Sequence, residues 1–328
     1  MTPTASPIRP SAERAKPVAP EMRVVLAAPR GFCAGVRRAI AAVETALDRF
    51  GAPIYVRRAI VHNLDVVGNL EKRGAIFVQE VDDVPPGSVL LLSAHGVAPR
   101  IRSSAQARNL RVFDAMCPLV DKVHHEVRRH HRDGHHVILI GHSGHPEIEG
   151  TFEQVPESAI TLVTEIGDIE RLEHRVGQRM AYATQTTFAV EDAKLIIARL
   201  QVLFPNIRGP KTSDICFATT NRQAAVRAIA RDVDAFIVVG EDFSSNARRL
   251  VEVALAEGCP RVQLVADGRM IDWGGLADAH SIGVTAAAST PEHSVTSVLD
   301  QIGDRYAVTI EEHPGPPEPA SFRAVEFA

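Results

Sequence analysis

The sequence is poor in cysteine and has no long apolar run. Four cysteines in 328 residues are too few for the disulfide framework of a small secreted protein, so each one needs its own explanation. No apolar stretch approaches the roughly 18 residues that a membrane-spanning helix needs, and no secretory signal pattern precedes the first strand pattern. We therefore expect a reduced, cytoplasmic protein without a membrane partner.

An excess of positive charge is also absent. Lys and Arg number 36 against 40 Asp and Glu, which gives a formal charge of −4. A mildly acidic chain is a poor partner for nucleic acid. The hydrophobic share of 45% and the charged share of 23% are typical of globular proteins, and the length corresponds to about two to three domains.

Short apolar runs alternate with helical patterns along the chain. Continuous runs of this kind are typical of parallel strands that are buried on both faces. We expect strands at 24–28, 89–93, 111–115, 137–141, 236–240 and 262–266, and helices at 34–49, 119–132, 190–204 and 246–257. This order predicts an α/β fold with short parallel sheets.

A coarse repeat accompanies the alternation, because cysteines recur before a helical pattern at intervals of roughly 80 to 100 residues. It predicts three α/β lobes around a common centre. We expect the first lobe, with the N-terminal strand, at 22–117, the second at 118–212 and the third at 213–312. Residues 1–21 and 313–328 are expected to be tails. The first tail is rich in proline, which favours disorder, and an organellar transit peptide is the alternative.

Three cysteines share one setting, which is the start of a predicted helix. Cys33 lies in PRGFCAGV, Cys117 in FDAMCPLV and Cys216 in SDICFATTNRQ. Helix starts stabilise thiolates, although a single cysteine there is better explained as a small buried side chain. Three widely spaced thiolates do not fit structural zinc; they could hold a 4Fe–4S cluster with one iron left free of protein ligands. Cys259 lacks this setting and is expected to be structural.

Polar side chains gather at the other predicted strand ends and helix starts. Hydroxyl, amide and imidazole groups in such places suit a phosphate or diphosphate, while each alone is an ordinary capping or turn residue. Ser289, for example, fits a capping box with Glu292. The set comprises His62, His95, His145, Glu147, Thr186, Thr187, Ser244, Ser245, Asn246 and Ser289. In the histidine-rich stretch 124–136, the residues after His124 are expected to form a solvated helix that ends at Asp133 and Gly134 rather than a metal site.

Ten segments in order carry a family resemblance: PRGFCAGVRRAI, VHN, RGAIF, SAHGV, FDAMCPLV, KVH, GHPEIEGT, TQTT, DICFATTNRQ and SSN. From about Val24 to Gln301 the chain resembles the 4-hydroxy-3-methylbut-2-enyl diphosphate reductases of the non-mevalonate isoprenoid pathway. The resemblance implies a three-lobed fold around one central 4Fe–4S cluster, with Cys33, Cys117 and Cys216 as its ligands. It also implies an allylic diphosphate substrate and ferredoxin or flavodoxin as the electron donor.

The implied reaction removes the substrate's allylic hydroxyl, bound at the open iron, and gives isopentenyl and dimethylallyl diphosphate. Glu147 matches the proton-delivering carboxyl, with Thr186 beside the hydroxyl. Glu149, two residues further along the same expected helix, should point elsewhere. The resemblance assigns the remaining substrate contacts to His62, His95, His145, Thr219, Ser244, Ser245, Asn246 and Ser289.

Four places depart from the usual family pattern: Leu64, Met116, 241–243 and Ala287. Glu241 and Asp242 would weaken diphosphate binding if they pointed into the site. Two alternatives to the reductase remain open at this point. One is a non-catalytic or low-activity iron–sulfur sensor of the same fold, and the other is a zinc hydrolase of phosphate esters.

Overall fold

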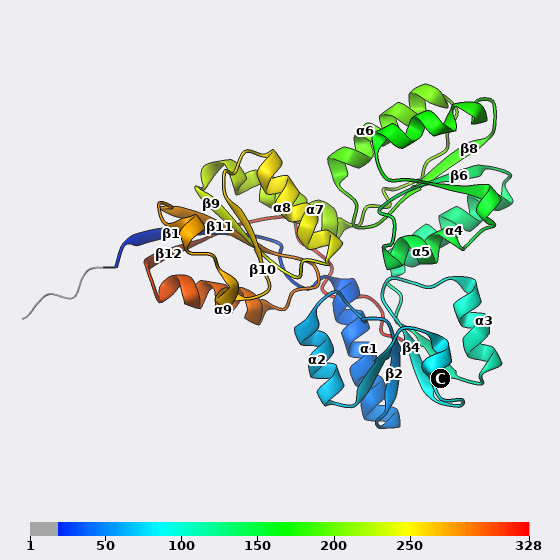
Figure 1. Cartoon of the computed structure of the whole chain (residues 1–328), viewed down its shortest axis with the longest axis horizontal. Coiled ribbons are helices and arrows are strands. Elements are labelled where there is room, and N and C mark those ends of the chain that lie inside the picture. The colour runs from blue at the N-terminus through cyan, green and yellow to red at the C-terminus, as the bar shows by residue number, and fades with distance from the viewer. Residues whose placement is uncertain (1–18, 328) are drawn as a thin grey trace, which may run out of the picture.

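A computed structural model describes residues 19–327, and of His174 only the backbone. These residues form three sheets, each covered by helices, in three lobes that meet near the centre of the molecule (Figure 1). Every strand pairing within the sheets is parallel. The predicted α/β class with short parallel sheets is confirmed.

The first lobe holds a four-stranded sheet in the order β3-β2-β4-β5. Its strands are β2 (Ile54–Arg57), β3 (Ala75–Val78), β4 (Val89–Leu92) and β5 (Arg111–Asp114), and its helices are α1 (Ala34–Phe50), α2 (Leu64–Lys72), η1 (Val81–Asp83) and α3 (Pro99–Ala107). β4 is buried along its whole length. Separate apolar clusters pack on the two faces of this sheet, which explains why its central strand reads as a continuous apolar run.

The second lobe holds a three-stranded sheet in the order β7-β6-β8. Its strands are β6 (His136–Ile140), β7 (Ile160–Val163) and β8 (Met180–Thr184), and its helices are α4 (Pro118–Arg132), α5 (Pro146–Phe152), η2 (Glu157–Ala159), η3 (Ile166–Arg175) and α6 (Val190–Leu203). The structure differs from the sequence expectation at α4, because His130 is buried rather than solvated; His124, which was not part of that expectation, is buried as well. They lie on the apolar face of an amphipathic helix, which packs against the sheet.

The third lobe holds a five-stranded sheet in the order β10-β9-β11-β1-β12. Its strands are β1 (Glu21–Ala27), β9 (Ala235–Val239), β10 (Val262–Val265), β11 (Ser281–Ala286) and β12 (Ala307–His313). Its helices are α7 (Phe217–Ile229), η4 (Ala230–Asp232), α8 (Ser245–Ala256), η5 (Gly268–Met270), η6 (Gly274–Leu276) and α9 (Glu292–Gly303).

β1 corrects one sequence expectation, which placed the N-terminal strand in the first lobe. Val24 of β1 aligns with Ile282 of β11 on one side and with Ile310 of β12 on the other. The strand is apolar on both faces and therefore needs neighbours and covering helices on both sides, which the third lobe provides. Glu21 and His313, assigned to the tails, are the ends of β1 and β12. The expected disorder of the first tail otherwise concerns residues 1–18, outside the described residues, and the remaining lobe boundaries stay a prediction.

Candidate active site

Each of the three predicted cysteines is the N-cap residue of a helix. Cys33 precedes α1, and its sulfur accepts the Val36 N–H at 3.5 Å. Cys216 precedes α7, and its sulfur lies 3.4 Å from the Thr219 nitrogen and 3.3 Å from its hydroxyl oxygen. Cys117 precedes α4, whose first position is Pro118, as proline's fixed φ favours. The helix-start setting inferred from sequence is confirmed.

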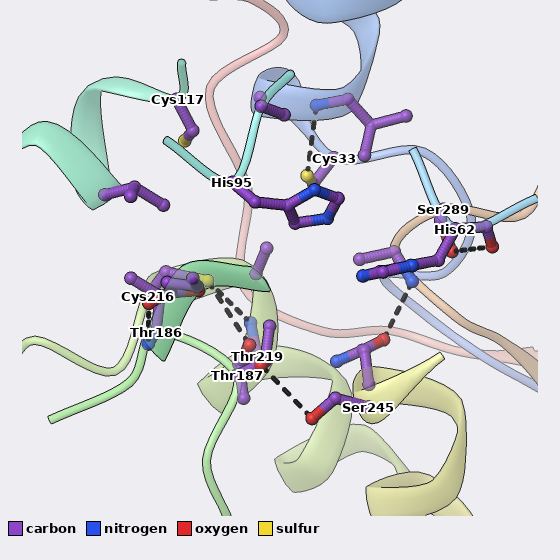
Figure 2. A pocket seen from close by; sticks show the side chains of 18 of the residues that line it. Cys33, His62, His95, Cys117, Thr186, Thr187, Cys216, Thr219, Ser245 and Ser289 are labelled. Carbon is purple, nitrogen blue, oxygen red and sulfur yellow. Dashed lines mark hydrogen bonds between the residues drawn. The ribbon is translucent and has the colours of Figure 1, made fainter. Parts of the chain in front are cut away.

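The three cysteines line one cavity of about 100 Å³ between the lobes (Figure 2). Its walls come from the carboxyl-terminal side of the strands, where ligands gather in parallel α/β folds. The cavity also brings together every other residue singled out from the sequence as a site residue: His62, His95, His145, Glu147, Thr186, Thr219, Ser244, Ser245, Asn246 and Ser289. Thr187 lines it as well, whereas Cys259 lies in the apolar core of the third lobe.

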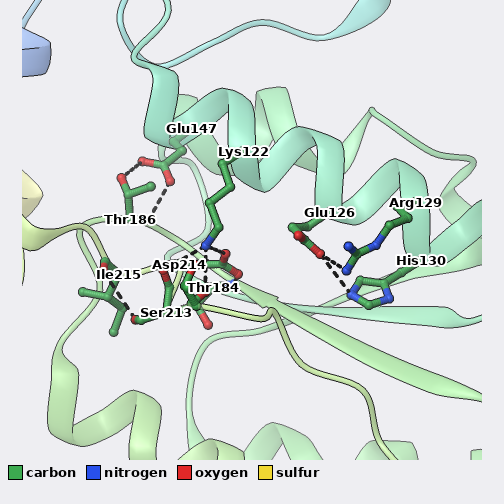
Figure 3. Close-up of polar contacts among 11 residues, drawn as sticks. Lys122, Glu126, Arg129, His130, Glu147, Thr184, Thr186, Ser213, Asp214 and Ile215 are labelled. Carbon is green, nitrogen blue, oxygen red and sulfur yellow. Dashed lines mark hydrogen bonds and ion pairs between the residues drawn. The ribbon is translucent and has the colours of Figure 1, made fainter. Parts of the chain in front are cut away.

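Glu147 lies in the first turn of α5 and is only 2% exposed. Its carboxylate accepts the Thr186 N–H on Oε1 at 2.6 Å and the Thr186 hydroxyl on Oε2 at 2.7 Å (Figure 3). Burial raises the pKa of Glu147 to about 7, although the two hydrogen bonds from Thr186 act in the opposite direction. The group can therefore hold or release a proton near neutral pH.

Glu149 has different surroundings, although it lies in the same helix. It pairs with Arg58 at 2.7 Å, and its side chain is 45% exposed. Residues two apart on a helix point about 200° apart, and the structure shows this divergence as expected from sequence.

Three histidines form a cluster in the cavity wall. The ring centroids of His62 and His95 are 4.2 Å apart, and that of His145 lies 5.5 Å from His62 and 5.9 Å from His95. Burial lowers the pKa of His62 to about 4, that of His145 to about 3, and that of His95 well below its usual value. The cluster is thus neutral at pH 7 in the protein alone, and Nε2 of His62 and Nδ1 of His95 are buried without a hydrogen-bond partner.

The third lobe adds hydroxyl and amide groups. Ser244 caps α8 by accepting the Ala247 N–H, and Thr187 donates to the Ser245 hydroxyl at 3.2 Å. Asn246 accepts the Ala288 N–H at 2.8 Å, which leaves its buried Nδ2 unpaired. Buried polar groups are seldom left without partners, so the unpaired amide and imidazole atoms indicate a polar ligand.

Ser289 belongs to the site rather than to a helix cap. Its hydroxyl donates to the His62 carbonyl at 2.9 Å, and α9 begins only at Glu292, with Pro291 as the N-cap residue. The capping-box alternative is therefore wrong. The hydrogen bond instead joins the third lobe to the loop that carries His62.

The residues that depart from the family pattern have identifiable contacts. The Glu241 carboxylate accepts the Leu64 N–H at 3.1 Å, at the start of α2, and so binds a helix start instead of pointing into the cavity. The Phe243 ring lies 6.0 Å from the His62 ring. The Met116 carbonyl accepts a hydrogen bond from Arg38 at 2.9 Å. Ala287 donates to the Val239 carbonyl at 2.9 Å.

The donors of the cavity are three cysteine thiols, the side chains that hold iron–sulfur clusters. In the described part of the chain, no group of three or more His, Cys, Asp or Glu side chains is arranged to hold one metal ion. Gly35 leaves a gap beside two of the sulfurs, because it has no side chain. A Cβ at this position would lie 2.8 Å from the Cys117 sulfur and 3.8 Å from the Cys33 sulfur. Burial raises the pKa of Cys117 to about 12 and that of Cys216 to about 11. The loss of water around a thiolate therefore costs more than the backbone N–H groups of the helix start return. A bound cationic centre would reverse this by stabilising the thiolates.

Sequence reasoning missed a partly buried ion pair near the cavity (Figure 3). Lys122 of α4 lies 3.0 Å from Asp214 Oδ1, and Asp214 Oδ2 accepts the Thr184 N–H at 3.0 Å. Burial raises the pKa of Asp214. The pair connects the helix that follows Cys117 with the loop that precedes Cys216. Both residues flank predicted ligand motifs, but nothing in the local pattern pairs them.

The fold and the cavity define a class: a three-lobed α/β protein whose centre is lined by three helix-start cysteines and a buried carboxyl. The family model described as LytB protein matches residues 24–303, and the chain belongs to this family. It is an enzyme, an oxidoreductase.

Relatives and solved structures agree with this assignment. A protein of Paracoccus denitrificans named 4-hydroxy-3-methylbut-2-enyl diphosphate reductase is 51% identical over 292 residues, 89% of this chain and 92% of the relative. A protein of the same name from a Ruegeria species is 50% identical, with the same coverage. The solved Plasmodium falciparum reductase superimposes with a TM-score of 0.87 at 37% identity and covers 92% of this chain and 95% of its own. No helix in residues 19–327 is long and apolar enough to cross a membrane.

Proposed function

We propose that this enzyme reductively removes the allylic hydroxyl of (E)-4-hydroxy-3-methylbut-2-enyl diphosphate. The products are isopentenyl and dimethylallyl diphosphate and water. Two electrons break the carbon–oxygen bond, one proton completes the water, and a second proton adds to the allyl carbon. The observation that carries the proposal is the cavity itself, in which three helix-start cysteines lie with a buried carboxyl whose pKa is about 7. The names of relatives at about 50% identity support the choice of substrate.

Cys33, Cys117 and Cys216 would hold a 4Fe–4S cluster. When bound, this group supplies electrons one at a time and an iron without a protein ligand that can act as a Lewis acid towards the hydroxyl. By the family resemblance, the electrons come from a small carrier such as ferredoxin or flavodoxin. The protein itself binds and orients the substrate, excludes water and delivers protons.

Glu147 and Thr186 form the proton-delivering pair. Oε1 of Glu147 accepts a backbone N–H, which cannot reverse its direction, so the carboxyl proton belongs on Oε2. There it can be donated to the Thr186 hydroxyl oxygen, at the 2.7 Å separation of the two atoms. The hydroxyl proton of Thr186 is then free to point into the cavity, towards the substrate's leaving oxygen. A carboxyl with a pKa near the working pH suits this role.

The diphosphate would be held mainly by neutral donors. No Lys or Arg is among the described residues that line the cavity. The unpaired nitrogens of His62, His95 and Asn246 are buried, and a hydrogen bond to a ligand at such a place, or at the start of α8, is stronger than in solution. A bound anion also opposes the lowering of the histidine pKa values, so that the cluster can take up positive charge as the ligand enters.

An anaerobic turnover assay tests this function. The reconstituted protein is given the allylic diphosphate and reduced methyl viologen, and we expect viologen oxidation together with both isoprenoid products. A cluster that responds to oxidants but gives no product would favour the sensor. Release of phosphate without any reductant would favour the zinc hydrolase. Either result would overturn the proposal.

A further inference from the structure

The C-terminal segment 314–327 joins two lobes. It leaves β12 in the third lobe, adopts no helix or strand, and reaches the first lobe, where it contacts α1 and β5 (Figure 1). There Phe327 is buried, with its ring 4.7 Å from Phe113 and 6.0 Å from Phe50, and its carbonyl accepts a hydrogen bond from Arg49. The family match ends at residue 303, so the segment lies beyond the part of the chain that the family model describes.

We call the segments around Cys33, Cys117 and Cys216 the cysteine loops. The buried guanidinium of Arg222 connects the C-terminal segment with two of them. Arg222 of α7 is 1% exposed, and its Nη1 donates to the two carboxylate oxygens of Glu318 at 2.9 and 3.1 Å. The same guanidinium donates to the carbonyls of Gly31 at 2.7 Å and Ala218 at 2.9 Å. Gly31 lies two residues before Cys33, and Ala218 lies two residues after Cys216. A buried guanidinium needs a carboxylate partner, and the C-terminal segment provides it.

The third cysteine loop is reached through Arg38 of α1. Its Nε donates to the Arg323 carbonyl at 2.8 Å, and its Nη1 donates to the Met116 carbonyl at 2.9 Å. Met116 directly precedes Cys117.

A ring contact adds to these hydrogen bonds. Phe322 lies 6.3 Å from the ring of Phe217, which directly follows Cys216. The segment therefore contacts each cysteine loop either directly or through an arginine side chain that donates a hydrogen bond to that loop.

We propose that segment 314–327 is a brace that holds the three cysteine loops in register, with Arg222 and Arg38 as the positioning residues through which it acts. The three thiols come from helix starts in different parts of the chain, and no cysteine-to-cysteine bond fixes them among the described residues. Their relative positions depend on how the lobes are held together. The inference rests on the proposed function in one respect, because a cluster is the group for which this register matters.

The test compares two Glu-to-Gln variants of the full chain. Glu318→Gln removes the buried countercharge of Arg222, whereas Glu311→Gln removes one partner of an exposed pair with Arg23. In the protein without metal, we expect faster amide hydrogen exchange at 31–38, 116–122 and 216–222 in Glu318→Gln and unchanged exchange in Glu311→Gln. If the three loops of Glu318→Gln exchange at the same rates as those of the unmodified protein, the proposed brace is wrong.

Cluster retention gives the second readout. After anaerobic reconstitution, a chelator should remove iron from Glu318→Gln roughly tenfold faster than from the unmodified chain, the scale of one lost charge-assisted hydrogen bond. If Glu318→Gln fails to fold, Phe322→Ala, which changes no charge, is measured in the same way, and unchanged iron loss and exchange in it would overturn the brace. An unmodified chain that binds no cluster would contradict the proposed function, while the exchange measurement would still decide on the brace.

Discussion

At the scale of single residues, the contrast between Glu147 and Glu149 shows how the surroundings set the role of a carboxyl. Glu147 is buried and its carboxylate accepts two hydrogen bonds from Thr186, whereas Glu149 is half exposed and paired with Arg58. Burial without a neighbouring cation raises the pKa of Glu147. Helix geometry alone separates the two side chains, which is why the sequence could predict their divergence.

Replacing each carboxyl by an amide tests this contrast. Glu147→Gln keeps the shape and can hydrogen-bond Thr186 in the same way, but it cannot release a proton. We expect turnover to fall by roughly 10²–10⁴-fold, the usual contribution of a general acid, with the metal content unchanged. Glu149→Gln is the matched control and should lose little activity. A folded Glu149→Gln that loses turnover while Glu147→Gln keeps it would show that the proton donor is assigned wrongly.

The pH dependence of turnover follows from the pKa of about 7 at Glu147. The proton donor must be in its acid form, and the fraction in that form falls as the pH rises through 7. We therefore expect kcat to decrease on the alkaline side with an apparent pKa near 7. The small residual rate of Glu147→Gln should lack this decrease. A rate of the unmodified enzyme that stays constant from pH 6 to 9 would contradict the assignment.

At the scale of secondary-structure elements, helix starts carry most of the site. The starts of α1, α4 and α7 follow the three cysteines, and α5 and α8 begin beside His145 and Ser244. These starts were predictable because capping and proline signals are local in the sequence. The interval Leu119–Arg132 was expected as helix, and α4 spans Pro118–Arg132. The capping box predicted at Ser289 was wrong, because Pro291 and not Ser289 is the N-cap residue of α9.

Two glycines in neighbouring helices provide a matched test of the space between the sulfurs. In Gly35→Ala the new methyl would meet the Cys117 sulfur at 2.8 Å, whereas in Gly68→Ala it would meet no atom within 4 Å. We expect Gly35→Ala to lose most of its iron after reconstitution. Gly68→Ala should bind iron normally and gain about 0.5–1 kcal/mol in stability to unfolding from its helix propensity. Full iron content in Gly35→Ala would show that the cysteine sulfurs do not need this gap.

At the scale of the whole molecule, the first and last strands of the described chain lie together in the third lobe. β1 lies between β11 and β12, so strands from opposite ends of the sequence are neighbours. Each strand is recognisable by itself, but nothing local in β1 says which of three sheets it joins. Sequence proximity favoured the first lobe, but the pairing of β1 with β11 and β12 places it in the third.

The same distinction explains which functional residues were found from sequence. The residues that line the cavity occur in compact motifs, so they were found from the sequence. Lys122–Asp214 and Arg222–Glu318 are pairs between segments about 90 to 100 residues apart. Their function depends on burial that only the folded chain creates, and a charged residue in the sequence gives no sign of it.

The central claim is that three cysteines from different parts of the chain hold one iron–sulfur cluster, and metal analysis tests it most directly. Iron, acid-labile sulfide and zinc are measured in the anaerobically reconstituted chain and in four Cys→Ser variants, at positions 33, 117, 216 and 259. We expect about four iron and four sulfide per chain, loss of most of both in the first three variants, and full content in Cys259→Ser. Stoichiometric zinc, iron without sulfide, or equal loss in Cys259→Ser would contradict the account.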